Sequence, residues 1–502
     1  MFVSLQAPFE EVGKKRFFRL EHWRFSKKAK CLIVFAIIAV MLISVFAFLP
    51  KESTSKASVI PQSTSPTGSP TASPTATPSP TKASNPWTDW IQPAGQAIAP
   101  PTPKSPGVIE TAQIINSTVW RKVAANAWNY FQPGVGVDAN TGLPYAGTGG
   151  FPYFTDWDLG AYIQAVIDAQ EIGLIGTDGN WGSYARLDKV LTFLETRELN
   201  STTGYPYWFY QSADGKDDHS MSDTSTALVD IVDTGRLFVA LNNLKAYSQA
   251  SNFNWTSRIN NIVYNNNVVD TNTNTIVNIT TNGNGNRSNY AALVPDIKSE
   301  TGSVSIYSYY YDSGYASFWP QLANVPNSIL TAIVNSPNIT SPYGNASLPL
   351  AGITGDPLLC SVFELNNNSS ALLALSKQIY LAHEAYYNAT GKYVAFSEGN
   401  SPSGFVWEWV VMPDGTLWTA GGSGGSISSD PVYYTKIAFG FLALYNTTFA
   451  RNMVISLEQQ LPDPTNGYSD GADNSGDVVS DLGSNTNSLI LDAALYYIQN
   501  NP

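Results

Sequence analysis

The sequence predicts an all-α body built from helical hairpins and preceded by one transmembrane helix. Apolar residues recur at helical spacing in many segments, and glycine-, asparagine- and aromatic-rich loops separate these segments. The loops exclude a coiled coil, and a parallel α/β fold would need hydrophobic strands that the sequence lacks. With 502 residues and 43% hydrophobic side chains, the chain can bury one large core.

The N-terminal region has the pattern of a membrane anchor. Residues 31–49 are apolar and uncharged, and a helix of this length spans a hydrocarbon core of about 30 Å. Residues 1–30 contain eight Lys and Arg against three Glu, so the positive-inside rule predicts a cytoplasmic N-terminus and an extracellular body. A cleaved signal peptide is the alternative, but no small-x-small cleavage site follows the apolar run.

Residues 50–107 predict an extended extracellular stalk, because they are rich in Ser, Thr and Pro and have little apolar surface to bury. The body, residues 108–502, carries eleven N-x-[ST] sequons. Their clustering indicates N-glycans on an external surface, with chance occurrence in Asn-rich loops as the alternative. The sequon asparagines are Asn116, Asn200, Asn254, Asn278, Asn286, Asn338, Asn345, Asn367, Asn368, Asn388 and Asn446.

Hydrophobic periodicity defines the expected helices of the body. It is clearest in 117–131 and 159–172, where apolar residues fall on one face. Further helices are expected at 183–198, 224–247, 255–266, 326–335, 356–388, 430–446, 448–460 and 485–499. Short strand-like segments lie near 303–311 and 404–412.

Composition argues against several kinds of chemistry. After residue 30 the chain has 19 basic and 36 acidic residues, which disfavours a nucleic-acid partner. With Cys31 and Cys360 as the two cysteines, neither a disulfide framework nor a cysteine zinc site can form. The three histidines are scattered, and His219 and His383 are interpreted as a loop and a helix histidine rather than metal ligands.

Motif searches leave carboxylate chemistry as the main possibility. Phosphate-binding loops, nucleophile elbows and zinc-protease motifs are missing from the sequence, so no metal or other cofactor is predicted. The Asp-rich loop 470–481 lacks EF-hand spacing, and calcium binding there stays open.

The segment "FTDWDLGAYIQA" places two acids around a tryptophan at the start of a helix. Thr155 or Asp156 is a good N-cap, and acids suit the first helical turn. One cap does not account for both acids. Tryptophan stacks on the apolar face of a sugar ring, and aspartate accepts hydrogen bonds from its hydroxyls. We therefore expect Asp156 to be the cap, and Asp158 with Trp157 to face a carbohydrate site. Asp156 is also a candidate for binding the sugar.

Three other acids are candidates for a catalytic pair with Asp158. Asp233 lies near the front of an apolar helix, where an ion pair with Arg236 is the structural alternative. Glu364 interrupts an apolar run, so it is either paired or has a raised pKa that suits a general acid. Glu398 lies between a strand-like run and a flexible turn, a common place for a site residue. The aromatic candidates for sugar binding are Tyr207, Trp208, Trp407, Trp409 and Trp418.

This carboxylate pattern predicts a glycoside hydrolase acting on a polysaccharide. Glycoside hydrolysis needs one protonated carboxyl for the leaving oxygen and one ionised carboxylate for water or the sugar. Glu364 or Glu398 is the better acid. The alternative is a non-catalytic cell-surface glycoprotein or glycan-binding envelope module, which would lack opposed carboxylates. A polysaccharide lyase would need a Tyr or His base and a basic clamp for uronates, which the acidic composition disfavours.

Six segments, taken in order, resemble the family known as domain of unknown function 3131. They are "TDWDLGAYIQAVIDAQEIGLI", "VDTGRLFVALNNLKAY", "DPLLCSVFEL", "YYNATGKYVAFSEG", "YYTKIAFGFLALYN" and "GYSDGADNSGDVVSDLGSNTNSLILDAALYY". The resemblance covers roughly residues 112–500, and the first two segments also resemble a glucoamylase-like segment of cyclic β-1,2-glucan synthases. Residues 267–315 depart from the family pattern.

This resemblance implies an (α/α)6-like toroid with a carbohydrate-type cleft at one end. Toroids of this type resemble inverting enzymes more often than retaining ones. It also adds Arg236, Asn485 and Asn487 as expected substrate-binding residues. The positions that match the family are Thr155, Trp157, Asp158, Asp233, Gly235, Arg236, Glu364, Glu398, Asn485, Thr486 and Asn487.

Overall fold

The computed structural model describes most of the body of the chain. The described ranges are 104–148, 151–200, 204–217, 232–265, 269–270, 275–276, 305–341, 346–365, 369–402, 404–412, 420–422, 425–426 and 430–501. The predicted transmembrane helix and most of the stalk lie outside these ranges. Within them, no helix combines the length and the apolar character that crossing a membrane requires.

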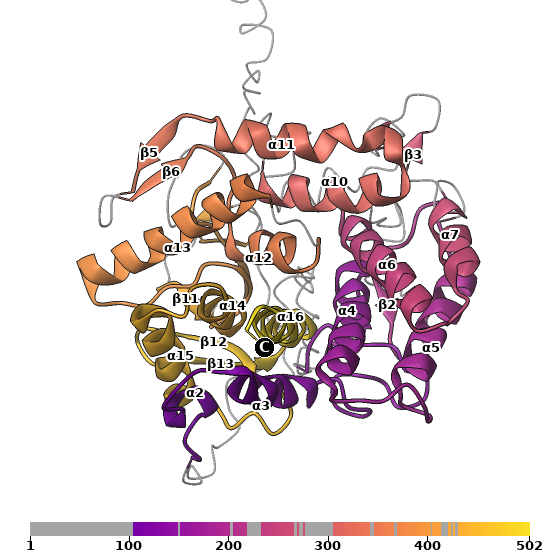
Figure 1. The fold of residues 1–502 in the computed structure, drawn as a ribbon, viewed down its shortest axis with the longest axis horizontal. Coiled ribbons are helices and arrows are strands. Elements are labelled where there is room, and N and C mark those ends of the chain that lie inside the picture. The colour runs from indigo at the N-terminus through magenta and orange to yellow at the C-terminus, as the bar shows by residue number, and fades with distance from the viewer. Residues whose placement is uncertain are drawn as a thin grey trace, which may run out of the picture. The chain divides into compact units, whose positions relative to one another are not determined.

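Six helices of the described chain form a closed inner ring. They are α4 (Asp156–Ile172), α6 (Asp233–Ala250), α10 (Ile306–Phe318), α12 (Gly355–Phe363), α14 (Thr435–Tyr445) and α16 (Ser484–Asn500). Each packs against the next in this order, and α16 packs against α4 to close the ring (Figure 1). Helix α4 is buried on nearly all sides, as a helix inside a large core should be.

Six helices on the outside alternate with the inner ones along the described chain. They are α3 (Ser117–Trp128), α5 (Ser183–Thr196), α7 (Thr256–Asn265), α11 (Asn324–Val334), α13 (Ser370–Thr390) and α15 (Thr448–Gln460). These helices bury one face and expose the other. The short helices α2 (Val108–Thr111) and η2 (Pro320–Leu322) pack on α15 and α10 respectively. This alternation confirms the predicted toroid of helical hairpins.

Short antiparallel strands lie in the loops between helices. Strands β7 (Glu398–Ser401), β8 (Gly404–Glu408), β9 (Ala420–Gly422) and β10 (Gly425–Ser426) form one sheet in the order β10-β9-β8-β7. Strand β12 (Ser469–Asp473) is central between β11 (Val432–Tyr434) and β13 (Val478–Leu482). Three further pairs are β1 (Tyr153–Phe154) with β2 (Tyr210–Gln211), β3 (Val269–Asp270) with β4 (Thr275–Ile276), and β5 (Asn338–Thr340) with β6 (Ser347–Pro349).

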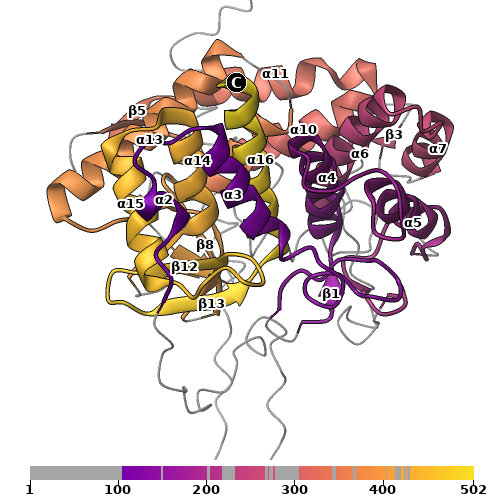
Figure 2. The ribbon, with the colours of Figure 1, turned by 60° about the horizontal axis from the view of Figure 1, so that its bottom comes forward.

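Strands β1, β8, β12 and β13 lie at one end of the toroid, shown at the bottom of Figure 2. Inner helices begin at this end, because β1 leads into α4, β11 into α14 and β13 into α16. Each outer helix brings the chain back to the same end before the next inner helix starts. Since aligned peptide dipoles give helix N-termini partial positive charge, this end favours carboxylates.

Close packing of α6 on α10 depends on two glycines. A Cβ atom on Gly235 would lie 2.8 Å from the Cα of Tyr311, and one on Gly314 would lie 1.9 Å from the Gly235 carbonyl oxygen. Both contacts are with backbone, which cannot move aside cheaply. The glycine that matches the family at position 235 therefore has a packing role in the inner ring.

Most of the expected helices are present within a few residues of their predicted bounds, and β8 lies in the segment expected near 404–412. The strand expected near 303–311 is wrong, because helix α10 begins at Ile306 with Ser305 as its N-cap. Its tyrosines favour strand locally, but burial among neighbouring helices overrides that preference.

Three other expected helices have different bounds. Helix α6 begins at Asp233, within the helix expected at 224–247, whose residues 224–231 lie outside the described ranges. The helix expected at 356–388 is two helices, α12 and α13, separated at residues 364–369. The helix expected at 430–446 begins only at Thr435, because Val432–Tyr434 pair with β12.

Candidate active site

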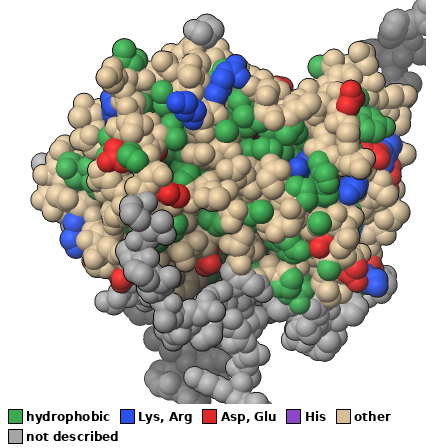
Figure 3. All heavy atoms as spheres, turned by 90° about the horizontal axis from the view of Figure 1, so that it is seen from below, with side chains coloured by type: hydrophobic (Ala, Val, Ile, Leu, Met, Phe, Trp, Pro, Cys, Tyr) green, Lys and Arg blue, Asp and Glu red, His purple; other side chains and the backbone are tan. Residues whose placement is uncertain are grey.

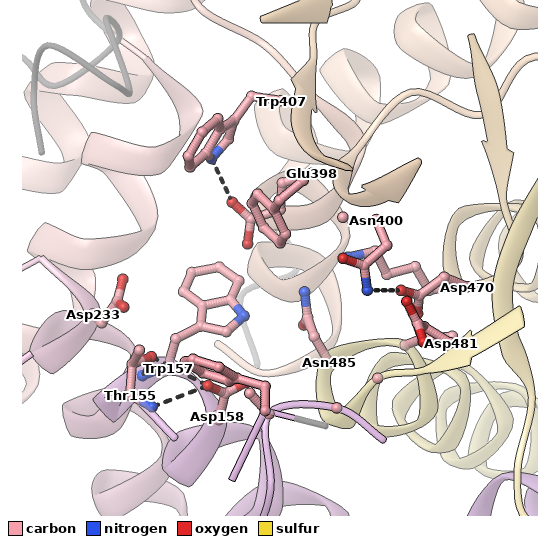
Figure 4. Close-up of a pocket in the computed structure, with 18 of the residues that line it drawn as sticks. Thr155, Trp157, Asp158, Asp233, Glu398, Asn400, Trp407, Asp470, Asp481 and Asn485 are labelled. Atoms are coloured by element: carbon pink, nitrogen blue, oxygen red, sulfur yellow. Dashed lines mark hydrogen bonds between the residues drawn. The ribbon is translucent and has the colours of Figure 1, made fainter. Parts of the chain in front are cut away.

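A cavity open to solvent lies at the end of the toroid where the inner helices begin, and Figure 4 shows its lining. The starts of α4, α6, α14 and α16 contribute to it, together with β7, β8, β12, β13 and the loops before β1 and β2. The lining residues are Ala146, Gly147, Phe151, Thr155, Trp157, Asp158, Trp208, Phe209, Asp233, Glu398, Gly399, Asn400, Phe405, Trp407, Lys436, Asp470, Asp481, Gly483, Asn485 and Thr486.

Aromatic rings form part of the cavity wall. Trp208 stacks on Phe209 with ring centroids 4.6 Å apart, and Phe151 meets Phe209 edge-on at 5.5 Å. On β8, Phe405 and Trp407 meet edge-on at 5.1 Å. Aromatic faces of this kind suit the apolar faces of sugar rings. Two of the predicted aromatic candidates, Trp208 and Trp407, therefore lie where they were expected.

Glu398, the first residue of β7, points into the cavity (Figure 4). Its Oε2 accepts hydrogen bonds from the Tyr307 hydroxyl at 2.7 Å and from Trp407 Nε1 at 3.0 Å. Burial, with the charges of Asp356 and Asp233, raises the pKa of Glu398 to about 7, against the opposing effects of Lys436 and Tyr307. This carboxyl can hold a proton near neutral pH and give it up, as a general acid must.

Asp158 also lines the cavity, and it has a structural role as well. Thr155 is the N-cap of α4, and Asp158 completes a capping box by accepting the Thr155 backbone N–H at 3.0 Å. Burial raises the pKa of Asp158 to about 6, opposed by the Thr155 N–H and by the charges of Arg236 and Lys436. Asp233, the first residue of α6, contributes a third carboxyl to the lining.

A polar network supports the cavity floor. Lys436, on α14, lines the cavity and makes an ion pair of 2.5 Å with the buried Asp356 of α12. Asn485 donates to the same carboxylate at 2.5 Å and accepts from Arg236 at 2.7 Å. Asn485 thus lies in the cavity as predicted. Arg236 lies beneath it, with its guanidinium carbon 4.3 Å from the Trp157 ring centroid.

Asp470 and Asp481 are two cavity carboxyls that were not among the predicted catalytic residues. They come from β12 and β13, within the loop singled out for its many aspartates. In the described ranges, no group of three or more His, Cys, Asp or Glu side chains is arranged to hold a metal ion. The usable sequence signal was the density of acids in the loop 470–481, for which the sequence left calcium binding open.

The prediction that Asp156 caps α4 is wrong. Its side chain is fully buried, with an ion pair of 2.5 Å to Arg197 and a hydrogen bond of 2.8 Å from the Thr234 hydroxyl. A cap position must stay outside the helix, whereas Asp156 is the first helical residue. Asp156 does not line the cavity, and its contacts join α4 to α6 and to the end of α5.

Glu364 is paired rather than free, the first of the two alternatives. It accepts from Arg236 at 2.9 Å and from the Tyr310 hydroxyl, and it does not line the cavity described above. Because Glu364 does not line this cavity, it is not placed to protonate a leaving oxygen there. Arg236 pairs with Glu364 and thereby ties α6 to the end of α12.

Three of the other predicted substrate-binding residues lie in the core. Tyr207 and Trp409 are almost fully buried and do not line the cavity. The Asn487 side chain accepts from the Tyr468 N–H at 2.8 Å and donates to the Tyr468 and Gly483 carbonyls. Trp418 lies outside the described residues. Aromatic and amide side chains close in sequence thus divide between core and cavity, and local sequence cannot separate them.

Two other sequence interpretations can be compared with the structure. His383 is a buried helix histidine, as interpreted, and its Nε2 accepts the Phe396 N–H at 3.2 Å. Among the described sequons, Asn116, Asn254, Asn338, Asn388 and Asn446 are exposed. Asn200 is buried, so its side chain is closed to glycosylation in this fold.

A family model described as "Protein of unknown function (DUF3131)" matches residues 122–501. The chain belongs to this family. A search of curated proteins gave no match. Among solved structures, an endo-β-1,2-glucanase from Talaromyces funiculosus in complex with sophorose is similar, with a TM-score of 0.52 and 11% identity over 79% of this chain and 89% of that one.

Another similar structure supports the same fold. A putative glucoamylase from Bacteroides uniformis has a TM-score of 0.50 and 14% identity, over 78% of this DUF3131 chain and 93% of the other. At such low identity these likenesses establish the shared toroid alone.

Proposed function

We propose that this DUF3131 protein is a membrane-anchored extracellular glycoside hydrolase that cleaves a neutral polysaccharide. The observation that carries the proposal is Glu398. It is a carboxyl with a pKa of about 7, held by Tyr307 and Trp407 in a cavity that combines further carboxyls with aromatic walls. These are the parts that glycoside hydrolysis requires.

Glu398 acts as the general acid. One of its oxygens accepts both hydrogen bonds, which fixes the carboxyl and leaves Oε1 to protonate the glycosidic oxygen. Asp158 and Asp233 bind sugar hydroxyls in the same cavity. We favour inversion, in which water attacks the face of the sugar opposite the departing oxygen.

The charge of the cavity supports a neutral glycan. Five carboxyl groups line it against one lysine, and that lysine is paired with Asp356. Uronate, sulfate or phosphate groups would meet like charges in a partly dehydrated space. The similar Talaromyces structures bind sophorose and β-1,2-glucan, so β-1,2-glucan is the first glycan to test.

The location rests on the sequence. The apolar run 31–49 and the basic residues before it support one membrane-spanning helix, with the body outside the cell. On the face shown in Figure 3, Lys and Arg are scattered rather than gathered in a patch, which agrees with a role away from nucleic acid. The exposed sequons support N-glycans on this surface.

The test is digestion of a glycan panel by the full-length chain, with products analysed by mass spectrometry. The panel contains β-1,2-, β-1,3-, β-1,4- and α-1,4-glucans, a β-mannan and a polyuronate. We expect cleavage of a neutral glycan and no cleavage of the polyuronate. If the chain binds a neutral glycan but cleaves no glycan of the panel, the result would favour a glycan-binding module over an enzyme.

A further inference from the structure

The catalytic pair needs a second carboxylate, and the geometry points to Asp470. We propose that Asp470 is the general base that holds the attacking water opposite Glu398. This inference rests on the proposed function. It names a residue that sequence reasoning did not select, in place of Asp158.

Asp470 is held rigidly at the cavity wall. It is 5% exposed, and each of its oxygens has one donor, with Thr486 bonding Oδ1 at 2.6 Å and Asn400 bonding Oδ2 at 3.1 Å. A Cβ atom on Gly483 would lie 2.9 Å from Oδ1, so a glycine is needed beside the carboxylate. Two separate segments, β7 and the start of α16, therefore fix its position.

Strand β7 links Asp470 to Glu398, because Asp470 is hydrogen-bonded to Asn400 two residues after Glu398. Side chains alternate along a strand, so Glu398 and Asn400 of β7 project from the same face, and two residues of strand span about 6.6 Å. Asp470 lies one hydrogen bond beyond Asn400. Asp470 and Glu398 thus line the same cavity next to a shared strand. Inverting glycosidases separate their two carboxyls by about 6.5–9.5 Å, which leaves room for water.

The surroundings of the two carboxyls differ in the charges and donors that act on them. Burial raises the pKa of Asp470, but Thr486, the charge of Lys436 and Asn400 oppose that effect, while the neighbouring Asp481 adds to it. The pKa of Glu398 is raised to about 7 by burial and by Asp356 and Asp233. Inversion needs one carboxyl that holds a proton and one carboxylate that accepts a proton from water.

Asp158 is the other candidate for the base, and the variants compared below separate the two. One of its oxygens completes the capping box at Thr155, and burial raises its pKa to about 6.

In the hydrolytic step, Glu398 gives its proton to the glycosidic oxygen as the bond to the anomeric carbon breaks. The water oxygen bonds to that carbon, and Asp470 takes the proton that the water loses. Exchange with solvent then returns both groups to their starting states.

The test compares Asp470→Asn, Glu398→Gln and Asp158→Asn on β-1,2-gluco-oligosaccharides and on a glucosyl fluoride oligosaccharide. Fluoride leaves without acid assistance, so it restores turnover to a variant that lacks the acid but not to one that lacks the base. We expect kcat of Asp470→Asn to fall at least about 100-fold on both substrates. The kcat of Glu398→Gln should fall similarly on the glycan and should recover on the fluoride substrate. Asp158→Asn should change mainly KM.

Retention of more than a third of wild-type kcat by Asp470→Asn, or its recovery on the fluoride, would overturn the inference. If that variant does not fold, Asn400→Ala and Thr486→Val serve instead. Each substitution removes one hydrogen-bond donor to the Asp470 carboxylate, so the acidic limb of the pH–rate profile should move to higher pH. If the acidic limb is unchanged in both variants, Asp470 is not the base. If the wild-type chain cleaves no glycan, that result contradicts the proposed hydrolase function rather than the choice of Asp470 as the base.

Discussion

Replacing Asp156 with asparagine should destabilise the fold strongly, although Asp156 lies outside the cavity. The substitution leaves the Arg197 guanidinium, whose side chain is 1% exposed, without its anionic partner at 2.5 Å. Removing one member of a buried ion pair costs about 3–5 kcal/mol. A lost helix cap, by contrast, costs about 1 kcal/mol.

This magnitude converts into a measurable change in melting temperature. Unfolding entropy is about 2.1 cal/mol/K per residue, or about 0.8 kcal/mol/K for a toroid the size of residues 122–501. A loss of about 3–5 kcal/mol therefore lowers the melting temperature by about 4–6 °C. Denaturant titration of the same variant gives the free energy directly.

Two variants control this measurement. Asp178 is exposed, so Asp178→Asn should change stability by less than about 0.5 kcal/mol. The double variant Asp156→Asn with Arg197→Gln removes the orphaned charge and should recover part of the loss. A loss below about 1 kcal/mol for Asp156→Asn alone would refute the buried-pair reasoning and favour the weaker role of a cap.

Three further predictions follow from the same structure. Burial raises the pKa of Glu398 and Asp168 to about 7 and that of Asp158 to about 6, so between about pH 4 and 7 the native state binds more protons than the unfolded chain. The free energy of unfolding should therefore fall as pH rises through this window. Asp168→Asn should make this dependence on pH less steep in denaturant titrations. A free energy of unfolding that rises with pH would contradict the pKa directions. Gly235→Ala should cost about 1–3 kcal/mol of stability, because its Cβ would lie 2.8 Å from the Tyr311 backbone. The control is Gly176→Ala, which should be tolerated because its Cβ would have no neighbour within 4 Å. Equal melting temperatures for the two variants would count against the close packing of α6 on α10. Tyr307→Phe removes a hydrogen bond that favours the ionised form of Glu398, so the alkaline limb of the pH–rate profile should move to higher pH, and a downward shift would exclude Glu398 as the acid.

The sequence was most informative where the structural cause is local. Side-chain spacing within one turn or one helix determines the start of α4 and most helix bounds. It also made Thr155 one of the two candidates for the N-cap of α4. Glu398 was found because it follows a strand-like run and precedes a turn. The burial of Tyr-rich helix α10 depends on neighbours elsewhere in the ring, which is why that segment was predicted as a strand.

The remaining site residues depend on contacts between distant segments. Lys436 and Asp356 are 80 residues apart, and Asn485 and Asp356 are 129 apart. Asn400 reaches Asp470 across 70 residues. Periodicity does not reveal which loops meet at one end of a toroid. For the same reason it could not show that Glu364 would be held by Arg236 or that Asp156 would find Arg197.

The central claim is that Glu398 is the acid of a hydrolytic cavity, and the most direct measurement is kcat for Glu398→Gln on the glycan that the wild type cleaves. Glu408→Gln is the matched control, because Glu408 is buried on the neighbouring strand and does not line the cavity. We predict that Glu398→Gln lowers kcat at least about 100-fold while the fold is retained, and that Glu408→Gln keeps kcat near the wild-type value. Wild-type kcat in Glu398→Gln would contradict the account.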